Sequence, residues 1–183
     1  MKKTVLIFGL ISGAISSVLM LANVSFIDRI GFDKGLVVGY TSIVLAFLLV
    51  FFGVRSYRDN VGGGKISFGR AFSVGILITL ISCICYVVMW EIIYYNFLPD
   101  FVEKYSNYMI ESARSSGASA QEIATQVEEM KNMQVLLINP LYNAAFTFLE
   151  PFPVGLLFTL ISAFTLRKRS QEVPENEQLV STS

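Results

Sequence analysis

Apolar residues in this chain are gathered in long runs rather than on one face of amphipathic helices. Three runs, 4–27, 35–54 and 71–95, hold a single charged residue between them, Glu91. Each is close to the ~20 residues that a helix needs to cross a ~30 Å hydrocarbon core. A helix on a soluble protein would show a polar face every three to four residues, and none of these runs does. The pattern therefore predicts three transmembrane helices.

A fourth apolar stretch is interrupted by two prolines. Residues 141–149 are apolar and aromatic, Glu150-Pro151-Phe152-Pro153 follows, and apolar sequence resumes up to Leu166. Proline lacks a backbone donor, so two prolines this close together break or kink a helix. Proline is tolerated in the first turn of a helix. We therefore predict a short helix up to Glu150 and a fourth transmembrane helix over 151–166.

The segment between the third and fourth spans has the pattern of a helical hairpin, 99–139. Apolar residues recur at helical spacing on both sides of Gly117, where the first helix is expected to stop. Ser119 and Glu122 have the spacing of a capping box, and Asn139 before a proline is expected to cap the next helix. We expect the hairpin to close over the helix ends rather than to form a separate binding module.

Composition favours a membrane protein over a soluble one. Hydrophobic residues make up 54% of the chain and charged residues 15%, against roughly a quarter charged in soluble domains. We predict an all-α, polytopic membrane bundle over 1–169, with about four transmembrane helices, and a polar, disordered tail over 170–183. The first run is too long for a cleaved signal peptide and no small-x-small cleavage pattern follows it, so we expect it to be retained.

Basic and acidic residues fall on opposite sides of this topology. The segments before the first span, between the second and third, and after the fourth are basic, whereas the hairpin is acidic. Under the positive-inside rule the basic side is the cytoplasm, which places both termini inside and 99–139 outside. The basic residues are Lys2, Lys3, Arg55, Arg58, Lys65, Arg70, Arg167, Lys168 and Arg169.

Two acids, Glu91 and Glu150, are the candidate functional residues, because ionisable groups at membrane depth are costly and often functional. Glu91 lies about 31 Å along a helix from Arg70, and Glu150 about 25 Å from Arg167. Both therefore lie in the outer half of the bilayer. The favoured interpretation is that each reaches the interface and is solvated there, in an aromatic belt around Trp90. The functional hypothesis, which we put forward as a prediction, is that they are neighbours that share a proton.

Small residues four apart open the first two spans, at Gly9 and Gly13 and at Gly35 and Gly39. Such spacing lets membrane helices approach closely. We expect these glycines to serve helix packing within one chain rather than dimerisation.

Composition also limits the chemistry of the chain. Its net charge is zero and it contains no histidine, which argues against nucleic-acid binding and removes the commonest metal ligand and general base. Cys83 and Cys85 lie in an apolar run and are expected to pack as small hydrophobic residues. We expect no catalytic, cofactor-binding or metal-binding residues, no cofactor and no enzymatic activity.

Short motifs follow one another in a fixed order along the chain, at 9–13, 66–72, Glu150 with 153–157, 160–163 and 167–169. Together they resemble the bacterial membrane family called domain of unknown function 4199. The resemblance covers about residues 3–169 and implies a four-helix inner-membrane protein of a bacterium, without a known activity.

Two functions are compatible with these features. A structural or partner-binding membrane component is favoured, with the lipid bilayer and a membrane protein or a second copy of the chain as partners. The alternative is a small transporter or channel component that works as an oligomer, because four helices rarely enclose a pathway alone.

Charge segregation predicts the topology directly. A reporter fused after Ser183 should be active in the cytoplasm, and one inserted at Gly117 should be active on the opposite side, because the basic segments stay inside. Paired cytoplasmic and extracytoplasmic reporters measure this. A C-terminus outside the cytoplasm would contradict the predicted topology.

Overall fold

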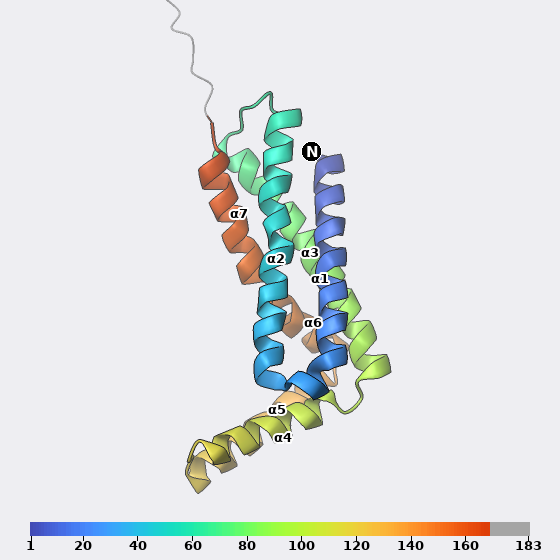
Figure 1. Ribbon diagram of the computed structural model, residues 1–183, viewed down its shortest axis with the longest axis vertical. Helices are drawn as coiled ribbons and strands as arrows, with labels where there is room; N and C mark the ends of the chain where they lie inside the picture. The colour runs from blue at the N-terminus through green and yellow to red at the C-terminus, as the bar shows by residue number, and fades with distance from the viewer. Residues whose placement is uncertain (169–183) are drawn as a thin grey trace, which may run out of the picture.

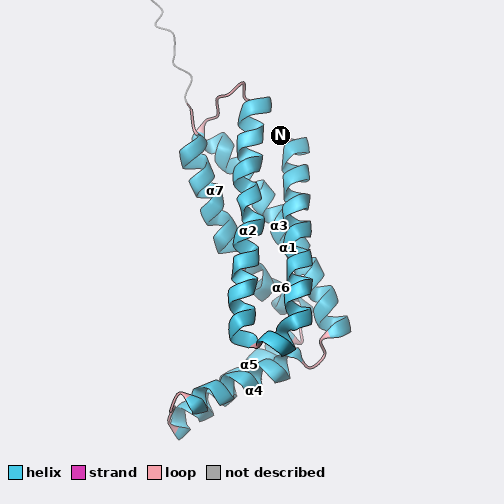
Figure 2. Cartoon of the chain, viewed as in Figure 1, coloured by secondary structure: helices cyan, strands magenta, loops and turns pink. Residues whose placement is uncertain are grey.

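Helices account for the secondary structure of the described chain (Figures 1 and 2). The computed structural model describes residues 1–168, so the predicted tail, 170–183, and Arg169 lie outside the described residues. The predicted all-α class is confirmed. The helices are α1 (Lys2–Ile30), α2 (Phe32–Asn60), α3 (Phe68–Phe97), α4 (Phe101–Ser115), α5 (Ala120–Leu137), α6 (Pro140–Leu149) and α7 (Phe152–Leu166).

Four segments are long and apolar enough to cross a membrane: α1, α2, α3 and the pair α6–α7, which together cover Pro140–Leu166. The predicted number of spans is confirmed, but the helices extend beyond the predicted ranges. The predicted ranges end where the apolar run meets its first charged residue, whereas helical backbone hydrogen bonding continues through Arg29 of α1 and Arg58 of α2. The fourth apolar segment consists of two helices, α6 and α7, separated at Glu150 and Pro151, as the prolines predict.

The long helices form a bundle in which α1 and α7 occupy opposite corners. Both α1 and α7 pack against α2 and α3, and α2 also packs against α3. The largest side chains sealed inside the bundle include Phe47, Ile43 and Ile78. Outward-facing residues are apolar as well, for example Val18 and Val37, which are 64% and 67% exposed. A surface of this kind suits lipid, which solvates apolar side chains without cost.

Small residues bring α1 close to α3. A Cβ atom at Gly13 would lie 2.5 Å from Cys85 Cβ, and one at Gly9 would lie 2.8 Å from Ile81 Cβ. The Ser82 hydroxyl donates to the Gly9 carbonyl at 3.2 Å. Close backbone approach and interhelical hydrogen bonds are the interactions that hold membrane helices together, since apolar contact gains little in lipid.

The α3–α7 contact is built in the same way. The Thr79 hydroxyl lies 3.2 Å from the Gly155 carbonyl oxygen, to which it donates, and 3.1 Å from the Thr159 hydroxyl. All three residues are buried, and a Cβ atom at Gly155 would overlap the Thr79 side chain. α7 is therefore packed tightly against α3.

A single residue, Gly31, connects α1 to α2. Its φ angle is +79°, a conformation that costs residues with a Cβ atom but not glycine. This sharp turn places α1 and α2 side by side over their whole lengths (Figure 1).

The N-terminus, the α2–α3 loop and the end of α7 lie together at one end of the bundle, which we call the basic end (Figure 1). An isolated β-bridge joins Ile66 to Lys168 and ties the loop to the end of α7. The described residues that make this end basic are Lys2, Lys3, Arg55, Arg58, Lys65, Arg70, Arg167 and Lys168.

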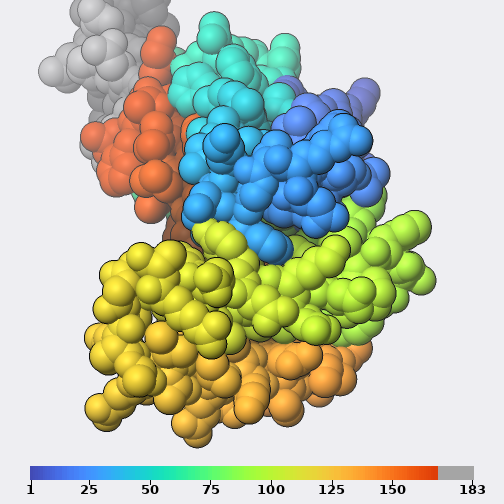
Figure 3. Space-filling view, turned by 60° about the horizontal axis from the view of Figure 1, so that its bottom comes forward, coloured from blue at the N-terminus to red at the C-terminus, as the bar shows by residue number. Residues whose placement is uncertain are grey.

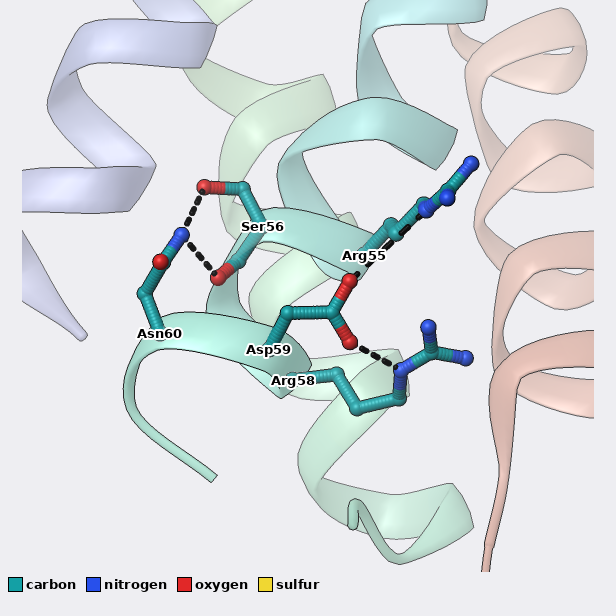
Figure 4. Close-up of polar contacts among 5 residues, drawn as sticks. All are labelled: Arg55, Ser56, Arg58, Asp59 and Asn60. Carbon is teal, nitrogen blue, oxygen red and sulfur yellow. Dashed lines mark hydrogen bonds and ion pairs between the residues drawn. The ribbon is translucent and has the colours of Figure 1, made fainter. Parts of the chain in front are cut away.

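Polar contacts close the last turn of α2 at the basic end (Figure 4). Asp59 lies between two arginines, with its Oδ1 atom 2.7 Å from Arg58 Nε and its Oδ2 atom 3.7 Å from Arg55 Nε. Asn60 Nδ2 donates to the Ser56 carbonyl at 3.0 Å. Positive side chains near a helix C-terminus also complement the helix dipole.

The α4–α5 hairpin lies across the other end of the bundle, the hairpin end, and projects to one side (Figures 1 and 3). The predicted capping box is confirmed: Ser119 N donates to Glu122 Oε2 at 2.7 Å, and Glu122 N donates to Ser119 Oγ at 3.3 Å. The first of these bonds holds the pKa of Glu122 below its usual value. Asn139 caps α6 as predicted, accepting from Leu141 N at 2.9 Å.

Replacing Gly13 with leucine should destabilise the bundle by about 1–3 kcal/mol, because the side chain would force α1 away from α3. Thermal melting in detergent measures this loss. Gly69→Leu is the matched control, since a Cβ atom at Gly69 would meet nothing within 4 Å. Equal melting temperatures for the two variants would mean that Gly13 does not mediate the α1–α3 contact.

Candidate functional site

The break between α6 and α7 positions Glu150. α6 ends at Leu149 and α7 begins at Phe152, so Glu150 lies at the junction. The nitrogen atoms of Pro151 and Pro153 carry no hydrogen, which removes the helical donors for the carbonyls of Thr147 and Leu149. The junction is therefore a place where the fourth span carries both a carboxyl group and weakened backbone pairing.

A cavity of about 400 Å³ lies in the bundle on the hairpin side of this junction. α7 packs against both α2 and α3, whereas the main neighbours of α6, besides α7, are α3 and α5. Space consequently remains between α6 and the first two helices. Residues that line it include Met20 and Asn23 of α1, Gly35 and Ile43 of α2, Tyr86 and Trp90 of α3, Phe101 and Tyr105 of α4, Leu137 of α5, Asn143 of α6, and Glu150 of the junction.

Glu150 is held by a tyrosine from the neighbouring helix. The Tyr86 hydroxyl donates to Glu150 Oε2 at 3.0 Å. Tyr86 is 7% exposed, and among the described residues it makes the one hydrogen bond to this carboxyl group. A carboxylate has room for about four such bonds, so most of its accepting capacity is unused.

About two helical turns further towards the hairpin, Asn143 organises a second polar group. Its Oδ1 atom accepts from Trp90 Nε1 at 2.9 Å and from the Thr147 hydroxyl at 3.3 Å. Its Nδ2 atom donates to the Leu137 carbonyl at 3.3 Å. The amide therefore joins α3, α5 and α6, and it fixes the Trp90 ring at the cavity wall.

Asn23 of α1 lies across the cavity with an unused oxygen. Its Nδ2 atom donates to the Gly35 carbonyl at 3.0 Å, whereas its Oδ1 atom is buried without a hydrogen-bond partner among the described residues. The glycines of α2 make room for it: a Cβ atom at Gly39 would lie 3.3 Å from Asn23 Nδ2. A buried acceptor without a donor costs about 1–3 kcal/mol, which a donor from a bound molecule would recover.

Aromatic rings close the hairpin end of the cavity. Phe101 of α4 lies edge-on to Trp90 at 5.2 Å and to Phe32 at 6.1 Å, between ring centroids. Tyr105 stacks along Phe101 at 6.4 Å. A salt bridge between Lys104 and Asp28 also attaches α4 to the end of α1, with 3.7 Å between Nζ and Oδ1. The hairpin thus covers the bundle end, as its sequence predicts.

The structure does not bring the two candidate acids together. Glu150 lines the cavity and Glu91 does not, and no hydrogen bond joins their carboxyl groups among the described residues. Glu91 lies five positions after Tyr86 on α3, which turns its side chain about 140° away from the face that holds Glu150. Glu91 Oε1 is buried without a partner among the described residues. The prediction of an adjacent pair is therefore corrected. The two acids have similar estimated depths in the bilayer, but they lie on different helix faces.

The four glycines expected to serve helix packing divide between two places. Gly9 and Gly13 lie at the α1–α3 contact, whereas Gly35 and Gly39 of α2 face α1 and also line the cavity.

Residues 7–168 match the family described as "Protein of unknown function (DUF4199)". The chain belongs to the DUF4199 family. No curated protein and no solved structure matches the chain. Membership brings this DUF4199 protein no assigned activity, so its function has to be argued from the cavity.

Sequence reasoning identified Glu150 but missed its partner Tyr86, and it missed Asn23 and Asn143. Each is a polar residue inside an otherwise apolar run, which is the signal that could have found them. Hydroxyl and amide groups are common in membrane helices, however, and only the helix arrangement shows which of them meet.

Two double-mutant cycles test this geometry. Tyr86→Phe and Glu150→Leu should be non-additive in the free energy of unfolding by about 0.5–3 kcal/mol, because each removes the same hydrogen bond. Glu91→Leu and Glu150→Leu should be additive within ~0.5 kcal/mol, because separate sites act independently. Unfolding by titration with a denaturing detergent provides the values. Strong coupling between the two acids would restore the predicted pair and contradict the helix faces described above.

Proposed function

We propose that this DUF4199 protein is a binding component of the membrane, whose cavity holds a small and mostly apolar molecule. The observation that carries the proposal is the cavity itself. Its volume, about 400 Å³, falls within the ~300–1,000 Å³ of small-molecule sites, which are typically apolar and aromatic with a few placed polar groups. Glu150, Asn143 and Asn23 are such groups in an apolar and aromatic lining.

The cavity is accessible from the side of the bundle. Leu36 of α2 and Phe146 of α6 line it, yet they are 47% and 49% exposed. The cavity therefore reaches the surface between α2 and α6, and both helices belong to apolar spans. This position supports a ligand that arrives from the bilayer.

Binding is favoured over conduction because the other half of the bundle is packed. Between the cavity and the basic end, α2 and α3 meet through fully buried residues such as Phe47, Val50 and Ile78. A transporter or channel would need a path through this packed layer. Within a single chain, α2 and α3 would have to separate to open such a path. We also retain as part of the proposal that the protein is not an enzyme and needs no cofactor.

We propose further that the basic end faces the cytoplasm, with the protein in a bacterial inner membrane. The clustered lysines and arginines support this orientation. It places the cavity in the outer half of the bilayer, beneath the extracytoplasmic hairpin.

Filling the cavity should abolish binding. In an uncharged detergent, the probe 1-decanol at roughly 100 times its Kd should raise the melting temperature of the wild-type protein by about 5 °C or more. Ser42→Phe should remove this shift, because Ser42 lines the cavity. The measurement is thermal unfolding with increasing decanol.

Thr41→Phe is the matched control. Thr41 neighbours Ser42 on α2, makes the same hydrogen bond to a carbonyl one turn earlier, and is exposed outside the cavity. This variant should keep the wild-type shift. A wild-type protein that decanol does not stabilise, or equal shifts in both variants, would contradict a ligand-binding cavity.

A further inference from the structure

Most of the hydrogen-bond donors around the cavity are already used within the protein. Seven of the ten lining side chains that carry a donor donate to an acceptor of the chain. The remaining cavity hydroxyls, on Tyr94, Tyr105 and Ser106, can accept as well as donate. The donors with acceptors in the chain belong to Tyr86, Trp90, Asn143, Asn23, Ser16, Ser42 and Thr147.

Two acceptors at the cavity have hydrogen-bonding capacity that the described chain does not fill. Glu150 receives one hydrogen bond among the described residues, from Tyr86, and Asn23 Oδ1 receives none. The orientation of the Asn23 amide is set by its Nδ2 atom, because the opposite orientation would place two oxygens together at the Gly35 carbonyl. A ligand complementary to these groups must carry donors.

Charge narrows the ligand class further. Glu150 is the one ionisable acid among the residues that line the cavity, and no lysine or arginine of the described chain lines it. An anionic head group such as a carboxylate or phosphate would therefore lie beside the Glu150 carboxyl group and find no counter-ion. A cation would form a charge-assisted hydrogen bond with Glu150.

The aromatic residues that α3 contributes to the cavity also favour a positively charged ligand. Tyr86 and Trp90 lie on the α3 face that borders Glu150, with Tyr94 one turn beyond. Trp90 and Tyr94 have their ring centroids 5.9 Å apart. The faces of such rings attract ammonium groups, most strongly where water is excluded.

We propose that the cavity takes an amphipathic organic cation, with an ammonium head at Glu150 and an apolar chain along the rest of the cavity. This inference rests on the proposed function, since it names the chemical class of the ligand. The apolar chain suits the apolar and aromatic residues of the lining, and the ammonium group supplies the donor that Glu150 lacks.

Three probes of equal chain length separate charge from hydrophobic binding: decylammonium, 1-decanol and decanoate. With the full-length protein at neutral pH in an uncharged detergent, decylammonium should bind about tenfold or more tightly than decanol, and decanoate more weakly than decanol. Isothermal titration or the ligand-dependent melting shift gives the affinities. This comparison needs no variant.

Glu150→Gln should lower the affinity for decylammonium to that for decanol, because it removes the charge and keeps the shape. Glu91→Gln is the matched control, since Glu91 lies outside the cavity, and it should leave the preference unchanged. If the Glu150 variant does not fold, the order of the three affinities on the wild-type protein still decides whether the cavity prefers a cation.

The outcomes distinguish the two proposals. Binding of none of the probes would overturn the cavity's function and this inference with it. Equal affinities for decylammonium and decanol would leave the binding function standing and overturn the cationic class. A preference for the cation that survives Glu150→Gln would overturn the role of Glu150 and refute the inference in this form.

Discussion

Proline cannot donate a backbone hydrogen bond, and in a membrane no water replaces the missing donor. In the fourth span two prolines stand within three residues, at Pro151 and Pro153, so one continuous helix gives way to α6 and α7. The two pieces then have different neighbours: α7 packs against α2 and α3, while α6 packs mainly against α3 and α5. The space that α6 leaves beside α1 and α2 is the cavity, and the junction residue Glu150 lies at its border.

Small residues serve opposite purposes in the two halves of the bundle. Towards the basic end, Gly13 and Gly155 bring helices into contact so closely that a Cβ atom would overlap the neighbouring helix. Towards the hairpin end, Gly35 and Gly39 border an open cavity as well as α1. The first arrangement gives a packed layer without a path for solutes. The second gives room for a ligand and lets Asn23 reach the α2 backbone.

Hydropathy and turn chemistry were enough to predict the four spans and the hairpin, because lipid burial and local capping are properties of neighbouring residues. The Ser119 capping box is an example. The helices are longer than the predicted spans, since backbone hydrogen bonding continues past the first charge. Glu150 stood out as an acid in an apolar run, but so did Glu91, and depth alone could not separate them. Their helix faces, and the meeting of Glu150 with Tyr86, depend on how α3 and α6 are rotated, which one sequence does not encode locally.

The most direct test of this account removes the break in the fourth span. The double variant Pro151→Ala, Pro153→Ala restores both backbone donors, so α6 and α7 should join into one helix. The measurement is the melting shift that decanol produces in this variant. The account predicts a folded protein in which the shift is lost, because a continuous helix no longer leaves the space beside α2. A folded variant that keeps the full wild-type shift would contradict it.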